Sequence, residues 1–476
     1  MRSAERKTPA ARALRMFSDI RFWLVVVFLI RLVGITDPPL ENTHSWRQAF
    51  TNMVARNLAE GPFDLLNPHT DLAGERTAIV ASEFPGYNAL IVFYRVFGPA
   101  HWYGRLIALV VSTLGAWAFH ALQLRRYGKR IAFLSTFVLL WSAWFVYGRK
   151  SMPDTFSVAL VLIALYAVDK AFTDRRWAWL LLATPLAALG GLCKIPAIVL
   201  CAYWGLLVLD RSLSLRWRLL LASTLALAMA PVFWWYFHWQ PYLLSTYGNQ
   251  LYFPYGLHEG FVDLRPHMDK AFERFRFSAL MSHLAFVASL WGLWRSVRTG
   301  DRRTLWLVLG VALPFGYFIL KTGSVFALHA YYILPLVPLL ALLAGIGLSA
   351  LPKGAWTGVA VVLVAAEAMG LRWSDLTGGS ERAYLLRAET IADRHSGMDD
   401  LVATASGMDP RAMYYLHRHG WNLDREQVTD ARTLDSLGAL GLRAIFVERS
   451  VCDTSLPWLL LYEDADWRVY GPVSAP

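Results

Sequence analysis

Long apolar runs recur along the first three quarters of the chain and dominate its pattern of hydrophobic and polar positions. The runs Phe22–Ile30, Ile131–Val146 and Val359–Ala366 contain no ionisable side chain. With their flanks, such runs approach the roughly 20 apolar residues that a helix needs to cross a bilayer. The pattern predicts an all-α polytopic membrane protein with about eleven transmembrane helices. The expected spans are residues 17–35, 102–122, 131–147, 155–168, 177–192, 195–209, 217–235, 278–294, 305–320, 331–348 and 355–371.

Basic residues gather in alternate connections between these spans. Lys and Arg are concentrated near residues 125–130, 170–176, 211–218 and 295–303, and also in the segment before the first span. Such connections face the cytoplasm by the positive-inside rule. We therefore expect a multi-pass protein of the inner membrane with a cytoplasmic N-terminus. The connections between the basic ones are expected on the periplasmic side.

Composition agrees with a membrane protein and narrows the choice of partners. The chain is 56% hydrophobic and 17% charged, which an ordinary soluble surface cannot accommodate. Its 46 Lys and Arg against 35 Asp and Glu leave a formal charge of +11. That excess could indicate nucleic-acid binding, but it lies in short connections between spans, so we reject nucleic acid as a partner. The three cysteines have neither metal-ligand spacing nor the pattern of a disulfide framework.

Two stretches break the apolar pattern and are expected outside the membrane. The outer loop 36–101 contains two amphipathic candidates, Trp46–Leu58 and Tyr87–Phe97, expected as helices on the membrane surface. Residues 372–476 are polar and mix helical and strand patterns, which predicts a small soluble α/β domain. No glycine-rich phosphate loop occurs there, so a structural or acceptor-recognition role is expected. The chain thus divides into a transmembrane catalytic domain, 1–371, and a periplasmic domain, 372–476.

Ionisable residues next to the outer ends of spans are candidates for chemistry. Charge near hydrocarbon is costly unless it is paired, hydrated or functional. Asp37, Glu41, His44 and Arg47 follow the first span in DPPLENTHSWRQAF. A carboxylate there could take a proton from an attacking hydroxyl, and the guanidinium could bind phosphate through two hydrogen bonds. The alternative is a hydrated loop that caps the following helix.

Further acids lie on the same side of the membrane. Glu83 in ASEFPGYN precedes Pro85 and the second amphipathic candidate. Two acidic side chains beside one crevice would be the minimum for such a site, because one could act as a general base and the other as a metal ligand or an orienting group. Lys150 and Asp154 occupy the charged turn GRKSMPDTF between two spans. An ion pair that stabilises the helical hairpin is the alternative explanation for that turn.

Cationic residues also stand at the ends of spans. Lys194 lies in GLCKIPA between two apolar runs, where an unpaired ammonium group would be costly. Lys321 and His329 flank another span, and Tyr331 and Tyr332 add hydroxyls at its mouth. Each alone could be an interfacial anchor whose charged end reaches water. The convergence of several cations on one side favours an anionic ligand.

An ordered set of motifs makes the chain similar to a known superfamily. HSWRQ and VARNL follow the first span, and EFPGYN, MPDTF, CKIPA and HAYYILPLVPLLALLAG come after them. The chain thereby resembles the glycosyltransferase C superfamily, in its bacterial branch of family 39-like protein O-mannosyltransferases and lipid A aminoarabinose transferases. The resemblance implies transfer of a sugar from a polyprenyl phosphate to an acceptor at the periplasmic face, usually with inversion.

The resemblance also implies roles for individual residues. Glu41 stands at the position of the family's catalytic aspartate, and Lys194 resembles the lysine of a Lys-Gly-Pro turn, although Ile195 replaces that glycine. Glu83 matches an acid before proline, and His329 a basic residue before a tyrosine-leucine-proline motif. The hypothesis names Glu41, Glu83 and Asp37 as catalytic, Arg47, Lys194, His329 and Lys321 as donor phosphate-binding, and His44, Gln48, Tyr87, Asp154, Tyr331 and Tyr332 as substrate-binding.

These inferences leave several alternatives open. No cofactor is required by the sequence, and the carboxylates allow a divalent metal that no spacing demands. The expected partners are a polyprenyl-phosphate-linked sugar donor, a glycan, lipid or protein acceptor, and the lipid bilayer. A polysaccharide polymerase or ligase would use similar donors. A secondary transporter would place ionisable residues at mid-membrane, and a non-catalytic scaffold would need no clustered charges.

Overall fold

The computed structural model describes residues 16–41, 43–92, 101–250, 255–372, 376 and 381–472. Its contacts divide the chain into two compact units. The helical unit comprises Met1–Ile35, Arg105–Tyr236 and Phe253–Leu376. The sheet unit comprises Thr36–Gly104, Phe237–Tyr252 and Thr377–Pro476. The outer loop and the polar tail therefore belong to one unit, although the transmembrane region separates them in sequence.

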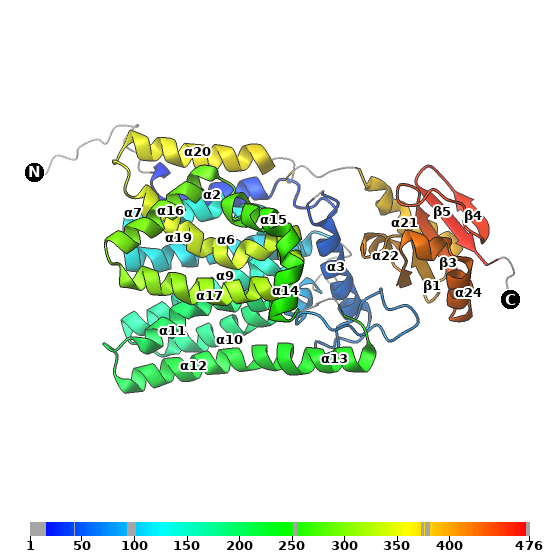
Figure 1. Ribbon diagram of the computed structural model, residues 1–476, viewed down its shortest axis with the longest axis horizontal. Coiled ribbons are helices and arrows are strands. Elements are labelled where there is room, and N and C mark those ends of the chain that lie inside the picture. Colours follow the sequence, from blue (N-terminus) through cyan, green and yellow to red (C-terminus); the bar gives the residue numbers. More distant parts are fainter. Residues whose placement is uncertain are drawn as a thin grey trace, which may run out of the picture. The chain divides into compact units, whose positions relative to one another are not determined.

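The helical unit is a bundle whose helices run side by side (Figure 1). Its first half contains α2 (Ile20–Arg31), α6 (Tyr103–Tyr127), α7 (Lys129–Leu140), α8 (Ala143–Tyr147), α9 (Pro153–Asp174), α10 (Ala178–Cys193), the 3-10 helix η1 (Ile195–Cys201), α11 (Ala202–Leu209) and α12 (Leu215–Trp234). Its second half contains α14 (Leu257–Leu264), η3 (Arg265–His267), α15 (Met268–Glu273), η4 (Arg274–Ser278), α16 (His283–Arg298), α17 (Arg302–Thr322), α18 (Ser324–Leu328), η5 (Ala330–Leu336), α19 (Val337–Leu348) and α20 (Ala355–Arg372). Between these halves, the π-helix η2 (Trp235–Trp239) and α13 (Gln240–Tyr247) follow α12 in sequence, and from Phe237 on this segment belongs to the sheet unit.

The prediction of a polytopic helical protein is confirmed, and every expected span coincides with a helix or an adjoining pair. Length and composition alone give a smaller number of spans than about eleven. Within the described residues, five helices are long and apolar enough to cross a membrane, or up to six if one bent pair counts as a single span. Shorter apolar helices cover Ala178–Cys193, Ile195–Leu209 and Ala355–Gly370.

Burial separates inner from outer helices of the bundle. In the most apolar windows of α9 and of the η5–α19 helix, 78% and 89% of residues are buried, against 22% in α17. Leu313 of α17 is 70% exposed and Val362 of α20 65%. Apolar side chains this exposed are expected to face lipid, since water would not solvate them favourably. The bundle therefore has a protein-packed interior and an apolar outer surface.

Two glycines let α16 and α19 approach closely. A Cβ built on Gly292 would lie 1.9 Å from the carbonyl oxygen of Leu343, and one on Gly347 would lie 2.0 Å from that of Ala288. Small residues at such crossings allow the backbones of membrane helices to meet. A larger residue at either position must push the two helices apart.

The tail forms a five-stranded sheet in the order β2–β1–β3–β5–β4. β1 pairs in parallel with β2 and β3, and β5 pairs antiparallel with β3 and β4. Alternate residues of its strands enter two different apolar cores, as the two faces of a sheet require. The strands are β1 (Leu401–Thr404), β2 (His419–Asn422), β3 (Leu442–Glu448), β4 (Leu459–Glu463) and β5 (Trp467–Gly471), with η7 (Ala383–Arg387), α21 (Ala388–His395), α22 (Arg411–Leu416), α23 (Arg425–Thr429) and α24 (Ala431–Ala439).

One face of this sheet is covered partly by the outer loop. The helix α3 (Ser45–Glu60) places Phe50, Met53 and Leu58 in the same core as Phe446 and Trp467. Its apolar stripe therefore packs against the tail, and the prediction that it rests on the membrane surface is wrong. The reason is that an amphipathic pattern specifies an apolar partner but not which one.

The second amphipathic candidate is described only in part. The helix α4 (Gly86–Ile91) covers the beginning of the expected helix Tyr87–Phe97. Residues 93–97 of that prediction lie outside the described residues.

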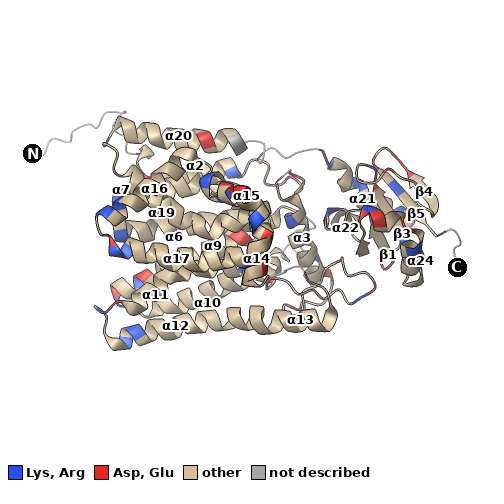
Figure 2. Ribbon diagram, viewed as in Figure 1, with Lys and Arg blue, Asp and Glu red and all other residues tan. Residues whose placement is uncertain are grey.

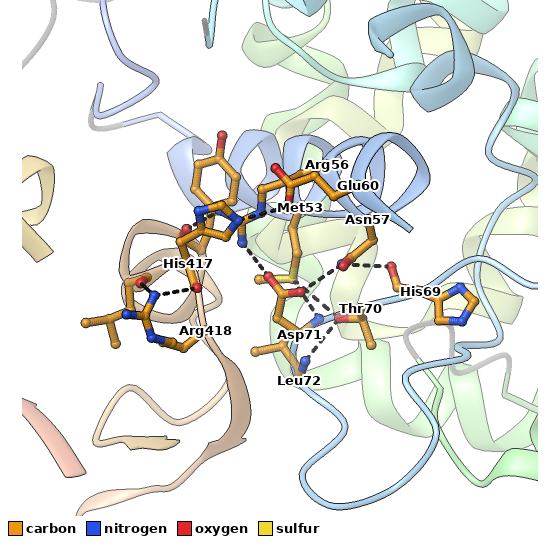
Figure 3. A network of polar contacts seen from close by, with 12 residues as sticks. Met53, Arg56, Asn57, Glu60, His69, Thr70, Asp71, Leu72, His417 and Arg418 are labelled. Atoms are coloured by element: carbon orange, nitrogen blue, oxygen red, sulfur yellow. Dashed lines mark hydrogen bonds and ion pairs between the residues drawn. The ribbon is translucent and has the colours of Figure 1, made fainter. Parts of the chain in front are cut away.

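A polar network ties α3 to the tail as well (Figure 3). Arg56 donates to the carboxylate of Asp71 at 2.5 Å and to the backbone oxygen of Tyr414 at 2.8 Å. Asn57 donates to the same carboxylate at 2.8 Å. The main chain adds a bond of 2.9 Å from the amide of Gly420 to the oxygen of Asp71. The loop after α3 is thereby fixed between that helix and the sheet domain.

His417 completes this network between two carboxylates. Its Nε2 lies 2.9 Å from Glu60 of α3 and its Nδ1 lies 2.7 Å from Glu389 of α21. The hydrogen bond to Glu60 raises the pKa of His417 above its ordinary value, against the opposing effect of burial. The folded protein therefore favours the charged imidazole.

Replacing Gly347 with Val tests the close crossing of α16 and α19. We expect a loss of about 1–3 kcal/mol, because the added methyl groups overpack the contact. The measurement is thermal unfolding in detergent. Gly316→Val in α17 is the matched control, since a Cβ there meets nothing within 4 Å. Equal midpoints for the two variants would contradict the packing argument.

Replacing His417 with Gln tests its charged pairing. A histidine whose folded pKa is raised contributes stability that is complete below its unfolded pKa and is lost as pH rises through the folded pKa. The difference in thermal midpoint between wild type and His417→Gln should therefore be largest near pH 6 and shrink toward about pH 9.

The matched control is His69→Gln, because the imidazole of His69 points away from the network (Figure 3). This variant should show no such pH-dependent difference. A His417→Gln difference that stays constant from acid to alkaline pH would show that the imidazole acts without its charge.

Candidate functional site

In the sheet unit, the start of α3 brings several predicted site residues together. His44 stands at the N-terminal cap with φ 59° and ψ 31°, a left-handed conformation that turns the chain into the helix. Glu41 precedes this turn and Gln48 follows it, and Gln48 Nε2 donates to Glu41 Oε1 at 2.8 Å. Both side chains belong to residues that are at most 4% exposed. The turn therefore holds a buried carboxylate against the first helical turns.

Arg47 and Glu83 form the second contact of this region. Arg47 Nη2 donates to Glu83 Oε1 at 2.8 Å, and the two side chains are 9% and 21% exposed. The ring of Phe50 lies 5.7 Å from the guanidinium carbon. A charge-assisted hydrogen bond of this kind fixes both groups in orientation. The segment around Arg47 and the segment around Glu83, which are far apart in sequence, thus meet through an ion pair.

Two further predicted site residues of the sheet unit are Tyr87 and Asp37. Tyr87 is fully buried and donates from its hydroxyl to the backbone oxygen of Gly104 at 2.6 Å. That geometry suits a structural hydrogen bond of the outer loop. Asp37 is exposed in the segment that follows α2.

In the helical unit, the predicted cation Lys194 lies at a break between α10 and η1. Its backbone is extended, with φ −159° and ψ 100°. Pro196 supplies the physical reason for the break, because proline cannot donate to a continuing helix. The break takes the ammonium group out of the helical register and toward the side chains of other helices.

The ammonium group of Lys194 lies near the carboxylate of Asp154 and the rings of two tyrosines. Its Nζ lies 3.5 Å from Asp154 Oδ1, at the first turn of α9, and 5.1 and 5.8 Å from the ring centres of Tyr332 and Tyr331. The lysine and aspartate side chains are 10% and 4% exposed. Pairing and cation–π contacts offset part of the cost of this burial. We call Lys194, Asp154, Tyr331 and Tyr332 the Lys194 cluster.

His329 joins the cluster through the two tyrosines, whereas Lys321 does not. The His329 ring lies 5.6 Å from the ring of Tyr331, at an interplanar angle of 20°. His329 stands at a second extended break, between α18 and η5. No hydrogen bond or ion pair joins the Lys321 side chain to the described residues, although its backbone oxygen accepts from Tyr255 at 3.0 Å.

Two buried arginines, Arg31 and Arg149, were not among the site residues predicted from the sequence. Arg31 of α2 is 0% exposed and donates to the hydroxyl of Ser112 at 3.0 Å. Arg149 donates to the backbone oxygen of Val33 at 2.6 Å. A Cβ on Gly148 would lie 2.0 Å from Arg31 Nη2, so glycine leaves room for the guanidinium. The signal was an arginine inside an expected span, which is costly in hydrocarbon and therefore informative.

The two clusters offer complementary chemistry. In the sheet unit, Glu41 is a carboxylate positioned by Gln48, and Arg47 is a guanidinium positioned by Glu83. In the helical unit, the Lys194 cluster combines an ammonium group with two tyrosines. Such groups can accept a proton from a hydroxyl and bind a phosphate. Among the residues that the structure describes, no three His, Cys, Asp or Glu side chains are grouped to hold a metal ion.

Comparison with known proteins identifies the fold. Residues 85–235 match the family model of dolichyl-phosphate-mannose-protein mannosyltransferase. No curated protein matches the sequence significantly. The structure is similar to that of ArnT from Cupriavidus metallidurans in the apo state, with TM-score 0.66 and 15% identity, over 95% of this chain and 97% of that one.

Two ligand-bound structures are also similar. One is ArnT from Cupriavidus metallidurans bound to undecaprenyl phosphate, with TM-score 0.63 and 14% identity over 95% of this chain and 99% of that one. The other is the archaeal oligosaccharyltransferase AglB from Archaeoglobus fulgidus, in complex with an inhibitory peptide and a dolichol-phosphate. It has TM-score 0.54 and 11% identity, over 90% of this chain and 70% of that one. The resemblance to the glycosyltransferase C superfamily is therefore confirmed at the level of the fold, and the chain is a multi-pass membrane protein.

Proposed function

We propose that the protein is a membrane glycosyltransferase that moves a sugar from a polyprenyl phosphate to an acceptor on the periplasmic side of the inner membrane. The observation that carries the proposal is the Lys194 cluster, where a buried ammonium group lies beside two tyrosines. A buried cation with hydroxyls beside it suits a phosphate ester. The fold supports the proposal, because similar structures were determined with undecaprenyl phosphate and with dolichol-phosphate bound.

The reaction needs one displacement. The acceptor oxygen forms a bond to the anomeric carbon, the bond from that carbon to the phosphate oxygen breaks, and its electron pair leaves with the polyprenyl phosphate. The proton of the acceptor passes to a carboxylate. Attack opposite the leaving group inverts the anomeric carbon. The protein must orient the acceptor, take the proton and stabilise charge on the phosphate.

We assign the base to Glu41. Its burial and its bond from Gln48 hold one carboxylate oxygen in a fixed direction. Glu83 instead is engaged with Arg47, so its first role is to orient that guanidinium toward an anionic substrate. Asp37 is exposed and is the weaker candidate for the base.

We assign recognition of the donor phosphate to Lys194, with the hydroxyls of Tyr331 and Tyr332 as additional donors. Asp154 holds the ammonium group in place through its contact of 3.5 Å. The stacked His329 ring supports Tyr331 and adds a second basic group to the cluster. Lys321 does not share these contacts, so we give it a peripheral part in donor binding.

Sugar transfer by wild type and by Glu41→Gln tests the proposed reaction. The purified protein is supplied with extracted polyprenyl-phosphate sugars and with membrane glycolipid or protein acceptors, and released carrier and product are followed by mass spectrometry. We expect Glu41→Gln to lower turnover by about 10²–10⁴-fold, the usual contribution of a general base. Donor binding should persist.

Glu75→Gln is the matched control, because Glu75 is an exposed acid of the same outer loop. It should keep wild-type turnover. Turnover that survives Glu41→Gln would move the base to Asp37 or Glu83. A wild-type protein that binds no polyprenyl phosphate would contradict the transferase and favour a transporter or scaffold.

Replacing Lys194 with Gln tests donor recognition separately from proton transfer. We expect the affinity for polyprenyl phosphate to fall about tenfold or more, because a charge-assisted contact with the phosphate is lost. Titration with polyprenyl phosphate, followed by intrinsic tryptophan fluorescence, measures this affinity. Lys194→Arg should restore part of it.

Lys270→Gln is the control, since Lys270 is an exposed lysine of the helical unit. Equal affinity in Lys194→Gln and Lys270→Gln would show that Lys194 only stabilises the bundle through Asp154.

A further inference from the structure

A cavity of about 720 Å³ lies in the helical unit, apart from the Lys194 cluster. It is lined by the last turns of α6, the middle of α9, η1 and α11, the first half of α17 and the start of α19. Ligand pockets typically measure about 300–1,000 Å³, so its volume suits a ligand. Among the described residues, those that line it include none of the predicted site residues. The inner lining includes Leu162, Leu165, Leu200, Leu206, Leu207 and Leu342.

The cavity opens on the apolar surface of the bundle. Leu209 at the end of α11 and Trp306 in α17 both line it, and they are 66% and 59% exposed. An opening between exposed apolar residues of a membrane-spanning bundle faces lipid rather than water. The occupant should therefore enter from the bilayer.

Polar groups gather at one end of this cavity. They are Arg126 at the end of α6, Asp210 after α11, and Asp301 and Arg303 at the start of α17. This is the end of the bundle that the positive-inside rule assigns to the cytoplasm. Figure 2 shows Lys and Arg near the beginnings of α7 and α12. The cavity thus has an apolar interior and a charged edge, so it is complementary to an amphiphilic ligand with an apolar tail and a charged headgroup.

Gln123 marks the boundary between these two parts. Its residue is 5% exposed and lines the cavity, and its Oε1 has no hydrogen-bond partner among the described residues. A buried amide oxygen without a donor costs free energy. A ligand with an N–H or O–H group at this depth would satisfy it.

The two arginines at the edge differ in their partners. Arg126 Nε donates to Asp169 Oδ1 at 2.6 Å, and the hydroxyl of Tyr203 donates to the same oxygen at 2.7 Å. The charge of Arg126 is therefore compensated inside the protein. Arg303 is exposed and makes no hydrogen bond or ion pair within the part of the chain that the structure describes, although it interacts electrostatically with Asp210, which lines the same edge. It is the cation of this edge that the protein engages least.

We propose that this cavity binds a membrane phospholipid whose headgroup carries a hydrogen-bond donor beside its phosphate. Arg303 would contact the phosphate, Gln123 Oε1 would accept from the headgroup donor, and the leucine lining would hold the upper part of the acyl chains. Basic pockets between membrane helices on the cytoplasmic side are suited to lipid headgroups. Phosphatidylglycerol offers a hydroxyl donor and phosphatidylethanolamine an ammonium donor. Phosphatidylcholine offers neither.

Lipid retention by the full chain tests this site. The protein is purified in detergent, stripped of lipid, and titrated with phosphatidylglycerol, phosphatidylethanolamine or phosphatidylcholine, and native mass spectrometry counts bound lipids. We expect at least one of the first two to be retained about tenfold better than phosphatidylcholine, because only they can satisfy Gln123. Which of the two is preferred tells whether a hydroxyl or an ammonium group is recognised.

Three variants locate the bound lipid. Arg303→Gln and Gln123→Leu should each lower retention about tenfold, and Leu206→Trp should abolish it by filling the cavity. Arg302→Gln, which removes the neighbouring charge outside the cavity lining, should not. Thermal unfolding of each lipid-free variant confirms that the bundle is folded.

Several outcomes would overturn the proposal. They are equal retention of all three lipids, equal loss of retention in Arg302→Gln and Arg303→Gln, or continued retention in Leu206→Trp. Each of these results is expected if the lipids bind around the outer surface of the bundle and not in the cavity. Preferential retention of polyprenyl phosphate, lost in Arg303→Gln, would replace the phospholipid with a second site for the carrier. Because neither Glu41 nor Lys194 takes part, failure of this site would leave the proposed transferase reaction unaffected.

Discussion

A charge inside the helical unit costs free energy unless a partner stabilises it, and this constraint decides how the bundle is built. Asp169 has a fully buried side chain, yet Arg125, Arg126 and the hydroxyl of Tyr203 all donate to its two oxygens. Lys194 is stabilised in the same way, by Asp154 and by two aromatic rings. The first set joins α6, α9 and α11, and the second joins α9 to two interrupted helices. The buried charged side chains, whose burial costs free energy, therefore also connect the helices through their contacts.

The interruptions follow from the same constraint. Lys194 and His329 both stand in extended backbone, and a 3-10 helix containing proline follows each of them. Backbone groups released from a helix must find partners, which is feasible inside protein but not in lipid. The breaks accordingly occur in buried segments, where η1 and η5 contact each other. In an uninterrupted helix, the side chains of Lys194 and His329 would follow the helical register and would lie away from the ring of Tyr332.

Local pattern explains why much of the fold could be predicted from the sequence. The apolar runs gave the positions of α6, α9 and α17, because a span in lipid must be a helix of nearly uniform hydrophobicity. The same pattern could not separate α7 from α8, or η1 from α11, since a short break leaves hydrophobicity unchanged. β2 and β4 were also not predicted. Their residues show no clear alternation, and the pairing of strands far apart in sequence decides that they form a sheet.

The sequence indicated which residues are candidates for the site, but it did not indicate which side chains they contact. The expectation that Glu83, Lys194 and Asp154 are unusual rested on charge near hydrocarbon, a property of one position at a time. Their partners come from other segments, so Arg47 with Glu83 and Lys194 with Asp154 needed the fold. Arg31 is an example of a cation whose importance depends on the fold. It lies within the expected span 17–35, and its complete burial beside Ser112 makes it one of the most constrained cations of the described residues.

The packing of α3 gives the polar tail a role that does not require it to touch a substrate. The first half of this helix carries Arg47 and Gln48, and its second half is held by Arg56 and Glu60 in contacts with the tail and the adjoining loop. Arg411 of α22 also donates to the hydroxyl of Ser45 at the beginning of the helix, at 2.8 Å. A helix fixed at both ends can hold side chains to within the small tolerances that catalysis needs. The tail therefore fixes α3, which carries the candidate residues Arg47 and Gln48, and the buried core that they share is the reason the two segments fold as one unit.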